Sequence, residues 1–540
     1  MKYDIHNPAG KTTMGGIYMV ETRFFNTAGP CNAQNHYMID AMRGLDKEIL
    51  SLIKDAQFFV IHAARQSGKT TLLRALAAHI NAGGVYYAVY CSLENLSSYA
   101  DADRGIPIVI EDIQNSLRRY KLPGASSFAS GAGSNSSANA LQIALETYCE
   151  SLEKPLVLLL DESDCLCGET LITFLRQLRS GYGYRSETPF VHSLALVGMR
   201  DIRDYKNDIR DPSDTLGSGS PFNISSESMT LKNFTREEIA YLYAQHTADT
   251  GQVFLDEAVD LVWEQTQGQP WLVNAIARII VKNTADAPQT PVTADMVAEA
   301  IQALILRWDT HFDSLMARLQ EERVKRVIEP IIIGEDEEIG YDSLDYRYVK
   351  DMGLIRDDRG YAEPANPIYG EIIVRNLSRN TQKKIESRGD DYPIPRYIKG
   401  DAIDMDILLR DFQAFWRENA EIWQEKYDYK EAAPHLILQA FLQRVVNGGG
   451  RIIREMAAGK GRADLCVVYN ERKYPIELKI RRDTKTYAKG VEQTAKYMDK
   501  CGCADGWLVI FDQRNTPSRD ERIFVNTEMV GDKTVTVYGC

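Results

Sequence analysis

A run of small and polar residues near position 65 has the composition of a phosphate-binding turn. It follows the apolar stretch 58–61 and consists of Ala64-Arg65-Gln66-Ser67-Gly68-Lys69-Thr70-Thr71. Backbone N–H groups of such a turn, and the positive end of the helix that follows, hold phosphate oxygens. Lys69 would then reach the β- and γ-phosphates, and the Thr70 hydroxyl would hold Mg²⁺. The segment therefore predicts a triphosphate site.

One residue of this segment departs from the usual pattern, G-x-x-x-x-G-K-[ST]. Ala63 stands where the first glycine belongs. Alanine adopts a negative φ comfortably and a positive φ only with strain. We therefore expect a regular backbone at the entry to the turn, with the phosphate contacts of the later residues unchanged.

Two acidic residues end the next fully apolar run, residues 156–160. A buried strand there would deliver Asp161 to the edge of a sheet, where it holds Mg²⁺ through water. Glu162 would then polarise the attacking water as a general base. The alternative is an acidic pair that only caps a helix after a core strand.

Arg200 follows a further apolar run, residues 193–197. Its guanidinium could contact the γ-phosphate through paired hydrogen bonds. A surface ion pair with Asp201 or Asp204 is the competing interpretation, and both stay open.

A second group of chemically capable residues lies far along the chain. Two strand-like runs, 463–469 and 473–480, follow one another. Because side chains alternate between the faces of a strand, Glu477 and Lys479 would share one face, which Asp464 could reach from the neighbouring strand. The two carboxylates suit Mg²⁺, and Lys479 could position a metal-bound water or stabilise charge on phosphorus. The set predicts phosphodiester cleavage; the competing interpretation is a strand with a surface Glu–Lys pair.

Two helical runs flank this predicted site. Glu431 begins the run that continues over 432–446, and Gln493 and Tyr497 lie one turn apart on the run that begins at residue 490. Basic residues gather nearby, as expected where a strand of nucleic acid approaches, and a solvated loop accounts for some of them. They are Lys460, Arg462, Arg481, Arg482, Lys485, Lys489 and Lys496.

Length and composition narrow the class of protein. A chain of 540 residues predicts about two to four domains. The net charge of −13 argues against a broadly basic nucleic-acid binder and leaves a local basic groove open. Apolar runs are too short for a membrane span, the first residues lack the core of a signal peptide, and the nine cysteines form no C-x-x-C pair. We expect reduced thiols in a cytoplasmic protein.

Strand-like and helical runs alternate between residues 58 and 200, which predicts a parallel sheet with helices on both faces. Residues 85–90 predict another strand of this sheet, and residues 38–53 have helical spacing. The stretch 124–139 is rich in glycine and serine and predicts a flexible loop.

The remaining elements continue this order along the chain. Residues 234–310 predict helices, with a start at Thr235 and an interruption at Gly268-Gln269-Pro270. Residues 321–375 predict two helices and a hairpin, the order of a winged-helix module. Residues 380–402 are polar and contain prolines, which predicts a linker.

The motifs between residues 20 and 375 together resemble the bacterial AAA-like domain ATP-binding proteins, within the AAA+/STAND group of P-loop ATPases. The matching segments are 25–31, 36–38 and 64–71. Asp161-Glu162 match the family's Walker B pair, Arg200 matches its strand-end arginine sensor, and Pro270 lies in a G-x-P motif like that of the STAND lid. The resemblance implies bound ATP with Mg²⁺, a helical lid and a winged helix. Because the sequence shows no trans-acting arginine finger, slow switching is favoured over motor-like ring hydrolysis.

Residues 425–515 resemble the PD-(D/E)XK nuclease superfamily. The resemblance rests on the ordered set Glu431, Asp464, Glu477-x-Lys479 and the Q-x-x-x-Y motif of Gln493 and Tyr497. It implies a nuclease domain that binds one or two Mg²⁺ and acts on nucleic acid, with DNA as the expected substrate. Ala463 stands where the family often has proline, a departure the family tolerates.

These inferences combine into one expected architecture of the α/β class. A P-loop NTPase parallel sheet with a helical lid and a winged helix precedes a PD-(D/E)XK-type α/β nuclease domain. The expected boundaries are 1–230 for the ATPase core with an N-terminal extension, 231–310 for the lid, 311–380 for the winged helix, 381–410 for a linker and 411–540 for the nuclease-like domain.

The expected function is an ATP-binding and ATP-hydrolysing switch that controls a Mg²⁺-dependent nuclease, in defence against foreign or phage DNA. One alternative is a nucleotide-dependent protein that binds nucleic acid, or signals, without cutting it. Another is a plain ATPase that remodels proteins. Whether the chain forms homo-oligomers stays open.

Overall fold

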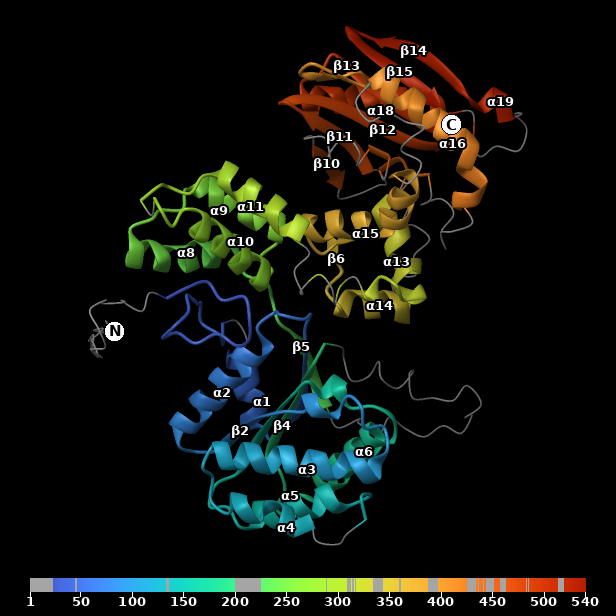
Figure 1. The fold of residues 1–540 in the computed structure, drawn as a ribbon. Coiled ribbons are helices and arrows are strands. Elements are labelled where there is room, and N and C mark those ends of the chain that lie inside the picture. The colour runs from blue at the N-terminus through green and yellow to red at the C-terminus, as the bar shows by residue number, and fades with distance from the viewer. Residues whose placement is uncertain are drawn as a thin grey trace.

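The chain forms an N-terminal sheet domain, a helical middle region and a C-terminal sheet domain (Figure 1). The computed structural model describes residues 23–43, 46–132, 136–199, 225–287, 289–307, 312, 315, 317–333, 343–358, 361–386, 397–424, 434–435, 437–439, 441–442, 451–456, 463–481, 483, 485–512 and 519–540. Within this described part, no helix is long and apolar enough to cross a membrane.

The N-terminal domain is built on a five-stranded sheet in which every pair of neighbouring strands is parallel. The strands, in the order β2-β3-β4-β1-β5, are β1 (Phe58–His62), β2 (Tyr87–Ser92), β3 (Leu156–Asp161), β4 (Ser193–Gly198) and β5 (Ser225–Thr230). Helices cover both faces, which explains why β3 and β4 are continuous buried runs rather than alternating ones. The helices of this domain are α1 (Asp46–Lys54), α2 (Lys69–Gly83), α3 (Ala102–Arg119), α4 (Phe128–Ala132), α5 (Ala140–Glu150) and α6 (Gly168–Tyr184), of which the short α4 packs mainly against α5.

Three segments differ from the prediction. The helix expected over residues 38–53 begins only at Asp46. The stretch 124–139, expected to be a flexible loop, contains the short helix α4, because Ala125 and Phe128 bury their side chains and the Phe128 ring packs edge-on against Tyr148. The linker expected over 380–402 is shorter, since α15 continues to Glu386.

The middle region begins with four helices, here called the lid: α8 (Arg236–Thr250), α9 (Asp256–Thr266), α10 (Pro270–Asn283) and α11 (Ala294–Arg307). The start expected at Thr235 is confirmed, because its hydroxyl accepts from the N–H of Glu238 while the Glu238 carboxylate accepts from the N–H of Thr235. The interruption near residue 268 separates α9 from α10.

A second part of the middle region, here called the hairpin module, follows the lid. It consists of α13 (Glu322–Ile333), α14 (Leu344–Asp351), β6 (Ile355–Asp358), β7 (Tyr361–Pro364) and α15 (Pro367–Glu386). The expected hairpin is confirmed by the antiparallel pairing of Asp358 with Tyr361. A small two-stranded sheet, β8 (Ile398–Lys399) with β9 (Ala402–Ile403), leads to the C-terminal domain.

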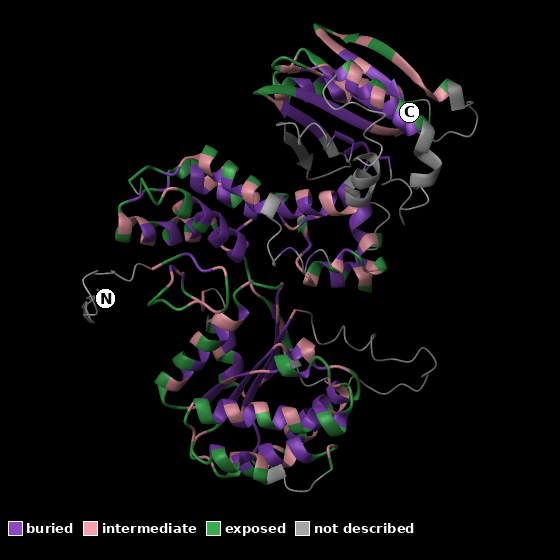
Figure 2. Cartoon of the chain, in the orientation of Figure 1, coloured by how far each residue is buried: buried purple, intermediate pink, exposed green. Residues whose placement is uncertain are grey.

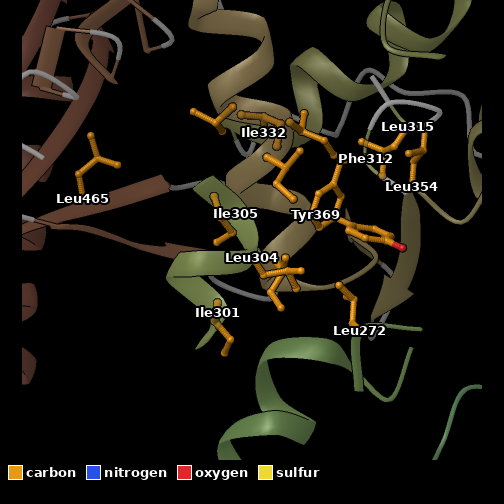
Figure 3. Close-up of a cluster of buried hydrophobic side chains, with 14 of the residues drawn as sticks. Leu272, Ile301, Leu304, Ile305, Phe312, Leu315, Ile332, Leu354, Tyr369 and Leu465 are labelled. Carbon is orange, nitrogen blue, oxygen red and sulfur yellow. The ribbon is translucent and has the colours of Figure 1, made fainter. Parts of the chain in front are cut away.

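The lid and the hairpin module share one hydrophobic core. Figure 3 shows Leu304 of α11, Ile332 of α13 and Tyr369 of α15 within this cluster. All three side chains are buried, and the same cluster continues into α16 and the C-terminal sheet. Burial of this kind gives the two parts a common packing surface rather than a flexible joint.

The C-terminal domain has a mixed six-stranded sheet in the order β10-β11-β12-β13-β15-β14. Strands β10, β11 and β12 form an antiparallel meander, whereas β12 pairs in parallel with β13. The interiors of both sheets are buried and the outer faces of the helices are exposed (Figure 2). The elements are α16 (Met405–Gln424), β10 (Arg451–Met456), β11 (Ala463–Tyr469), β12 (Arg472–Arg481), α18 (Thr486–Cys501), β13 (Asp505–Asp512), α19 (Arg519–Arg522), β14 (Phe524–Val530) and β15 (Lys533–Gly539).

Candidate functional site

The phosphate-binding turn lies between β1 and α2, at the carboxyl end of the sheet. The N–H of Ala63 donates to the carbonyl of Gly198 at 3.2 Å, which extends the pairing of β1 with β4 by one residue. The backbone at Ala63 is regular, as the sequence predicts, because this residue is not among those with positive φ. Gly68 has a φ of 97°, which glycine adopts readily, and it immediately precedes the first residue of α2. The backbone N–H groups of the turn therefore lie at the N-terminal end of this helix.

Lys69 is buried and held against the turn itself. Its Nζ donates to the carbonyls of Ala63 at 2.7 Å and Ala64 at 2.9 Å. Burial lowers the pKa of Lys69, and the nearby carboxylates of Glu162 and Asp161 act in the opposite direction. A triphosphate would supply further negative charge at the ammonium group, which favours its charged form.

Thr70 and Asp161 meet as the sequence predicts. The Thr70 hydroxyl donates to Oδ2 of Asp161 at 2.6 Å, and the Tyr90 hydroxyl donates to the same oxygen at 3.3 Å. Among the described residues there is no cluster of three or more His, Cys, Asp or Glu that could hold a metal ion. The oxygens of Thr70 and Asp161, with phosphate oxygens and water, form a ligand set that would suit Mg²⁺, a hard cation.

Glu162 lies beside Asp161 in a left-handed conformation with a φ of 55°. Burial raises the pKa of Glu162, and the carboxylates of Asp164 and Asp161 raise it further. A carboxylate with a raised pKa is a stronger base, which suits activation of a water. Glu162 also lines the cavity described next.

A cavity of about 850 Å³ lies between the phosphate-binding turn, the segment 23–43 and the lid. Its volume falls within the range of small-molecule sites in proteins. The turn residues Arg65–Thr71 and the acidic residues Glu162 and Asp164 line one part of it. The lid contributes another part of the wall, which includes Pro270, a residue that the sequence assigns to the nucleotide site. Arg200 lies outside the described residues.

The segment 23–43 closes the cavity by joining the lid to the turn. The N–H of Cys31 donates to the Thr71 hydroxyl at 3.0 Å, and the indole Nε1 of Trp271 donates to the carbonyl of Thr27 at 2.9 Å. Phe25 is buried against Tyr243 of the lid. The segment therefore forms a wall of the cavity that is hydrogen-bonded both to the lid and to the phosphate-binding turn.

The hairpin module contacts the entry of the phosphate-binding turn. Nε2 of His62 lies 3.6 Å from Oδ1 of Asp351, and a Cβ on Gly353 would overlap the Ala64 methyl. The Arg356 guanidinium also donates to Oε1 of Gln267 in the lid. These contacts could not be predicted from the sequence, because they join segments far apart in the chain.

Arg318 is a further cavity residue that the sequence does not predict. Its side chain lines the cavity and donates to Oε1 of Glu321 at 2.9 Å and to the Tyr348 hydroxyl at 3.2 Å. No motif marks it in the sequence. It reaches the cavity only because the chain returns there between α11 and α13.

In the C-terminal domain, Glu477 and Lys479 share one face of β12 as the sequence predicts. Glu477 is fully buried, and Lys479 Nζ forms an ion pair with Glu477 Oε1. Leu465 pairs with Ile476, so Asp464 and Glu477 follow one residue further on the two strands. The Asp464 side chain lies outside the described residues, as do Glu431, Lys460, Arg462 and Arg482.

Helix α18 packs against β12 and carries the two residues of the predicted Q-x-x-x-Y motif. Gln493 is half-buried, whereas Tyr497 is buried against Cys466 and Val468 on the sheet. The packing of Tyr497 is that of a core residue. His435, which no motif in the sequence indicates, is also buried, and the positive charge of Lys479 lowers its pKa further.

Comparison with known families gives two matches. The model described as "AAA-like domain" matches residues 27–374, which is more than half of the chain. The model described as "Domain of unknown function (DUF8371)" matches residues 412–515. No curated protein matches the chain.

Comparison with solved structures finds several that are similar to about two thirds of this chain. The Walker-type ATPase PABY2304 of Pyrococcus abyssi is 12% identical, with a TM-score of 0.45 over 65% of this chain and 99% of that one. The ORC2 protein of Aeropyrum pernix is 12% identical, with a TM-score of 0.40 over 64% and 95%. The RuvB Holliday junction branch migration motor of Thermotoga maritima is 12% identical, with a TM-score of 0.34 over 62% and 93%.

Proposed function

Because this chain belongs to the AAA-like domain family, we propose that its P-loop half is an ATP-controlled switch for the C-terminal domain. The observation that carries the proposal is the contact of the hairpin module with the phosphate-binding turn. The module contacts His62 and Ala64, which lie on either side of the turn entry. Occupation of the phosphate site and the position of the module are therefore linked.

The chemical step that operates the switch involves Lys69. In this structure its ammonium group binds the carbonyls of Ala63 and Ala64. To reach β- and γ-phosphates it must exchange at least one of these carbonyls for a phosphate oxygen. Ala64 is then released beneath Gly353, so the module contacts a different surface when a triphosphate is present. Bound Mg²⁺ would add Lewis-acid stabilisation of the phosphates, held by Thr70 and Asp161.

The hairpin module has the element order of a winged helix, two helices followed by a β-hairpin, and we assign it that role. Its core is continuous with that of the lid and the C-terminal domain. A movement at the phosphate-binding turn can therefore be transmitted through packed side chains to the C-terminal sheet. As part of this proposal we assign the ATPase core to residues 1–230, the lid to 231–310, the winged helix to 311–380, the linker to 381–410 and the nuclease-like domain to 411–540.

For the output we propose a Mg²⁺-dependent nuclease of the PD-(D/E)XK type that acts on DNA, in defence against foreign DNA. Two features support it. The meander β10-β11-β12 is followed by α18 and by β13, which pairs in parallel with β12. The carboxylate of Glu477 and the ammonium of Lys479 lie together on β12. Asp464 would complete the metal site from the neighbouring strand.

A second candidate output is binding of nucleic acid without cleavage. The observation that favours it is the complete burial of Glu477 in its ion pair with Lys479. A metal ligand and a phosphate must meet at an accessible oxygen, and a fully buried carboxylate offers none until the site opens.

The deciding experiment measures cleavage of plasmid and linear DNA by the full chain, with Mg²⁺ or Mn²⁺ and with or without ATP. A nuclease predicts products that disappear in Lys479→Ala and persist in Lys473→Ala, an exposed lysine of the same strand. ATP control predicts that Lys69→Ala removes the response to ATP. Unchanged cleavage in Lys479→Ala would exclude the nuclease assignment. ATP-dependent retention of DNA without products would favour the second candidate.

A further inference from the structure

Three cysteines gather at one end of helix α18 in the C-terminal domain. Cys466 lies on β11, Cys501 is the last residue of α18, and Cys503 follows in the turn after the helix. Cys466 and Cys501 pack in one cluster with Val468 and Tyr497, so the side chain of Cys466 lies on the face of β11 that α18 covers. The thiols of Cys466 and Cys501 are hydrogen-bonded to each other. The fold thus brings together two sulfur atoms from different elements.

The third thiol is directed differently. Sγ of Cys503 donates to the carbonyl of Lys473 at 3.5 Å and to the carbonyl of Cys501 at 3.7 Å, which are both backbone acceptors. Three thiols in one place would suit a soft metal ion. However, the described part of the chain contains no group of three or more His, Cys, Asp or Glu that could hold one. The arrangement therefore favours chemistry between the sulfur atoms of Cys466 and Cys501.

Buried cysteines commonly serve only as small apolar side chains. Cys540 fits that use, because its hydrophobic cluster includes no second cysteine among the described residues. The pair on β11 and α18 differs in two respects. Its sulfur atoms meet, and its members differ in exposure, since Cys466 is only 3% exposed whereas Cys501 is partly exposed. A small oxidant therefore has access to one sulfur atom that has a second beside it.

We propose that a hydroperoxide oxidises this pair to a disulfide between Cys466 and Cys501, which links the C-terminal end of α18 to β11. The inference goes beyond the proposed switch and does not require that the C-terminal domain cut DNA. Where the surroundings keep thiols reduced, disulfides of this kind form transiently and act as redox sensors.

The reaction has two steps. In the first, Sγ of Cys501 attacks the terminal oxygen of the hydroperoxide, the O–O bond breaks, and the thiol proton leaves with the alcohol or water. In the second, Sγ of Cys466 attacks the sulfenic acid on Cys501, and the S–O bond is replaced by an S–S bond. The released hydroxide takes the proton of Cys466 and leaves as water. The two sulfur atoms together lose two electrons, which the peroxide accepts.

The disulfide would restrict helix α18. This helix packs on β12 and β13, and it carries Gln493 and Tyr497 of the predicted Q-x-x-x-Y motif. A covalent link to β11 resists movement of the helix away from the sheet, because it removes open conformations from the ensemble. The oxidised domain should therefore open less often than the reduced one.

The test treats the full chain with hydrogen peroxide, blocks the remaining thiols with N-ethylmaleimide and maps the unreduced peptides by mass spectrometry. We expect two peptides, carrying Cys466 and Cys501, to be joined with the loss of two hydrogen atoms, and to separate on addition of dithiothreitol. The variants are Cys501→Ser, at the partly exposed position, and Cys466→Ala, which keeps the buried position apolar. Cys503→Ser is the matched control, since it removes the neighbouring partly exposed thiol.

The link should disappear in Cys501→Ser and Cys466→Ala and persist in Cys503→Ser. Hydrogen exchange of the amides in the last turn of α18 should be at least about tenfold slower in the oxidised chain than in the reduced chain. A link between Cys501 and Cys503, a link between two chains, or no link would overturn the inference. Equal exchange in the oxidised and reduced chains would also overturn it. Failure of the proposed function looks different, because ATP binding and DNA cleavage can be absent while the peptide link and the slower exchange remain.

Discussion

Nε2 of His62, the last residue of β1, lies 3.6 Å from Oδ1 of Asp351, the last residue of α14. His62 immediately precedes the phosphate-binding turn, and Asp351 immediately precedes the bend that leads into the hairpin. Two residues further along each segment, Ala64 and Gly353 are in contact as well. The hairpin module thus lies against the turn at two successive points, which is the arrangement that the proposed switch requires.

This contact gives the first prediction. Gly353→Ala should weaken the contact between the hairpin module and the turn, because the added methyl would overlap that of Ala64. Together with the cost of a positive φ, we expect a loss of about 2–4 kcal/mol in the free energy of unfolding. ATP binding should also change, as measured by calorimetry.

The matched control is Gly84→Ala. Gly84 has the same φ of 72°, and an added Cβ there meets nothing within 4 Å. It therefore reports the backbone cost alone, about 1 kcal/mol. Equal losses in the two variants, with ATP binding unchanged in both, would show that the module does not sense the turn.

The second prediction concerns Glu162 as general base. Glu162→Gln should lower the rate of ATP hydrolysis about a hundredfold or more, since loss of a positioned base has that effect. ATP affinity should stay within a factor of about two, because the phosphate contacts of Lys69 and Thr70 remain. Glu94→Gln is the control, since Glu94 is an exposed carboxylate that lines the same cavity. Normal turnover in Glu162→Gln would remove Glu162 from the chemistry.

The parts of the fold that follow from local sequence were predictable. The apolar runs at 156–160 and 193–197 are strands β3 and β4, and the turn before Lys69 leads into α2 as expected. The hydrogen bond between Thr70 and Asp161 was also predictable, because the carboxyl ends of parallel strands lie at one edge of the sheet. Each of these features depends on periodicity or on a motif within a few residues.

The features that depend on packing between distant segments were not predictable. Nothing around Asp351 or Arg318 in the sequence indicates that the first lies at the turn and the second at the cavity. The alternation of side chains along a strand correctly placed Glu477 and Lys479 on one face of β12. It does not say how deeply that face is buried, so the complete burial of Glu477 was not predicted. The burial of Tyr497 against β11 was missed for the same reason.

The third prediction tests the shared core of the lid and the hairpin module. Leu304→Ala should lower the free energy of unfolding by about 2–5 kcal/mol, because the side chain is fully buried and its removal leaves a cavity. Leu344→Ala is the control, since Leu344 of α14 is half exposed and should lose less than about 1 kcal/mol. Denaturant unfolding followed by circular dichroism measures both. Similar losses would mean that the two parts do not depend on a common core.

The last prediction is a pH dependence that comes from His435. Burial lowers the pKa of His435 to about 3, and the positive charge of Lys479 contributes to the shift. In the unfolded chain its pKa is near 6.5. Between these values the unfolded chain binds a proton that the folded chain does not. Stability from this group is therefore fully present above pH 6.5 and is lost progressively as the pH falls toward 3.

Between pH 7.5 and pH 5.0 the loss from His435 amounts to about 2 kcal/mol. His435→Gln should remove this part of the pH dependence, because glutamine does not titrate, whereas His79→Gln, at an exposed position, should leave it unchanged. Urea unfolding of the full chain at the two pH values measures the difference for each protein. If His435→Gln loses as much stability as the unmodified chain between pH 7.5 and 5.0, the imidazole is not held neutral beside Lys479 and the C-terminal site has a different charge arrangement.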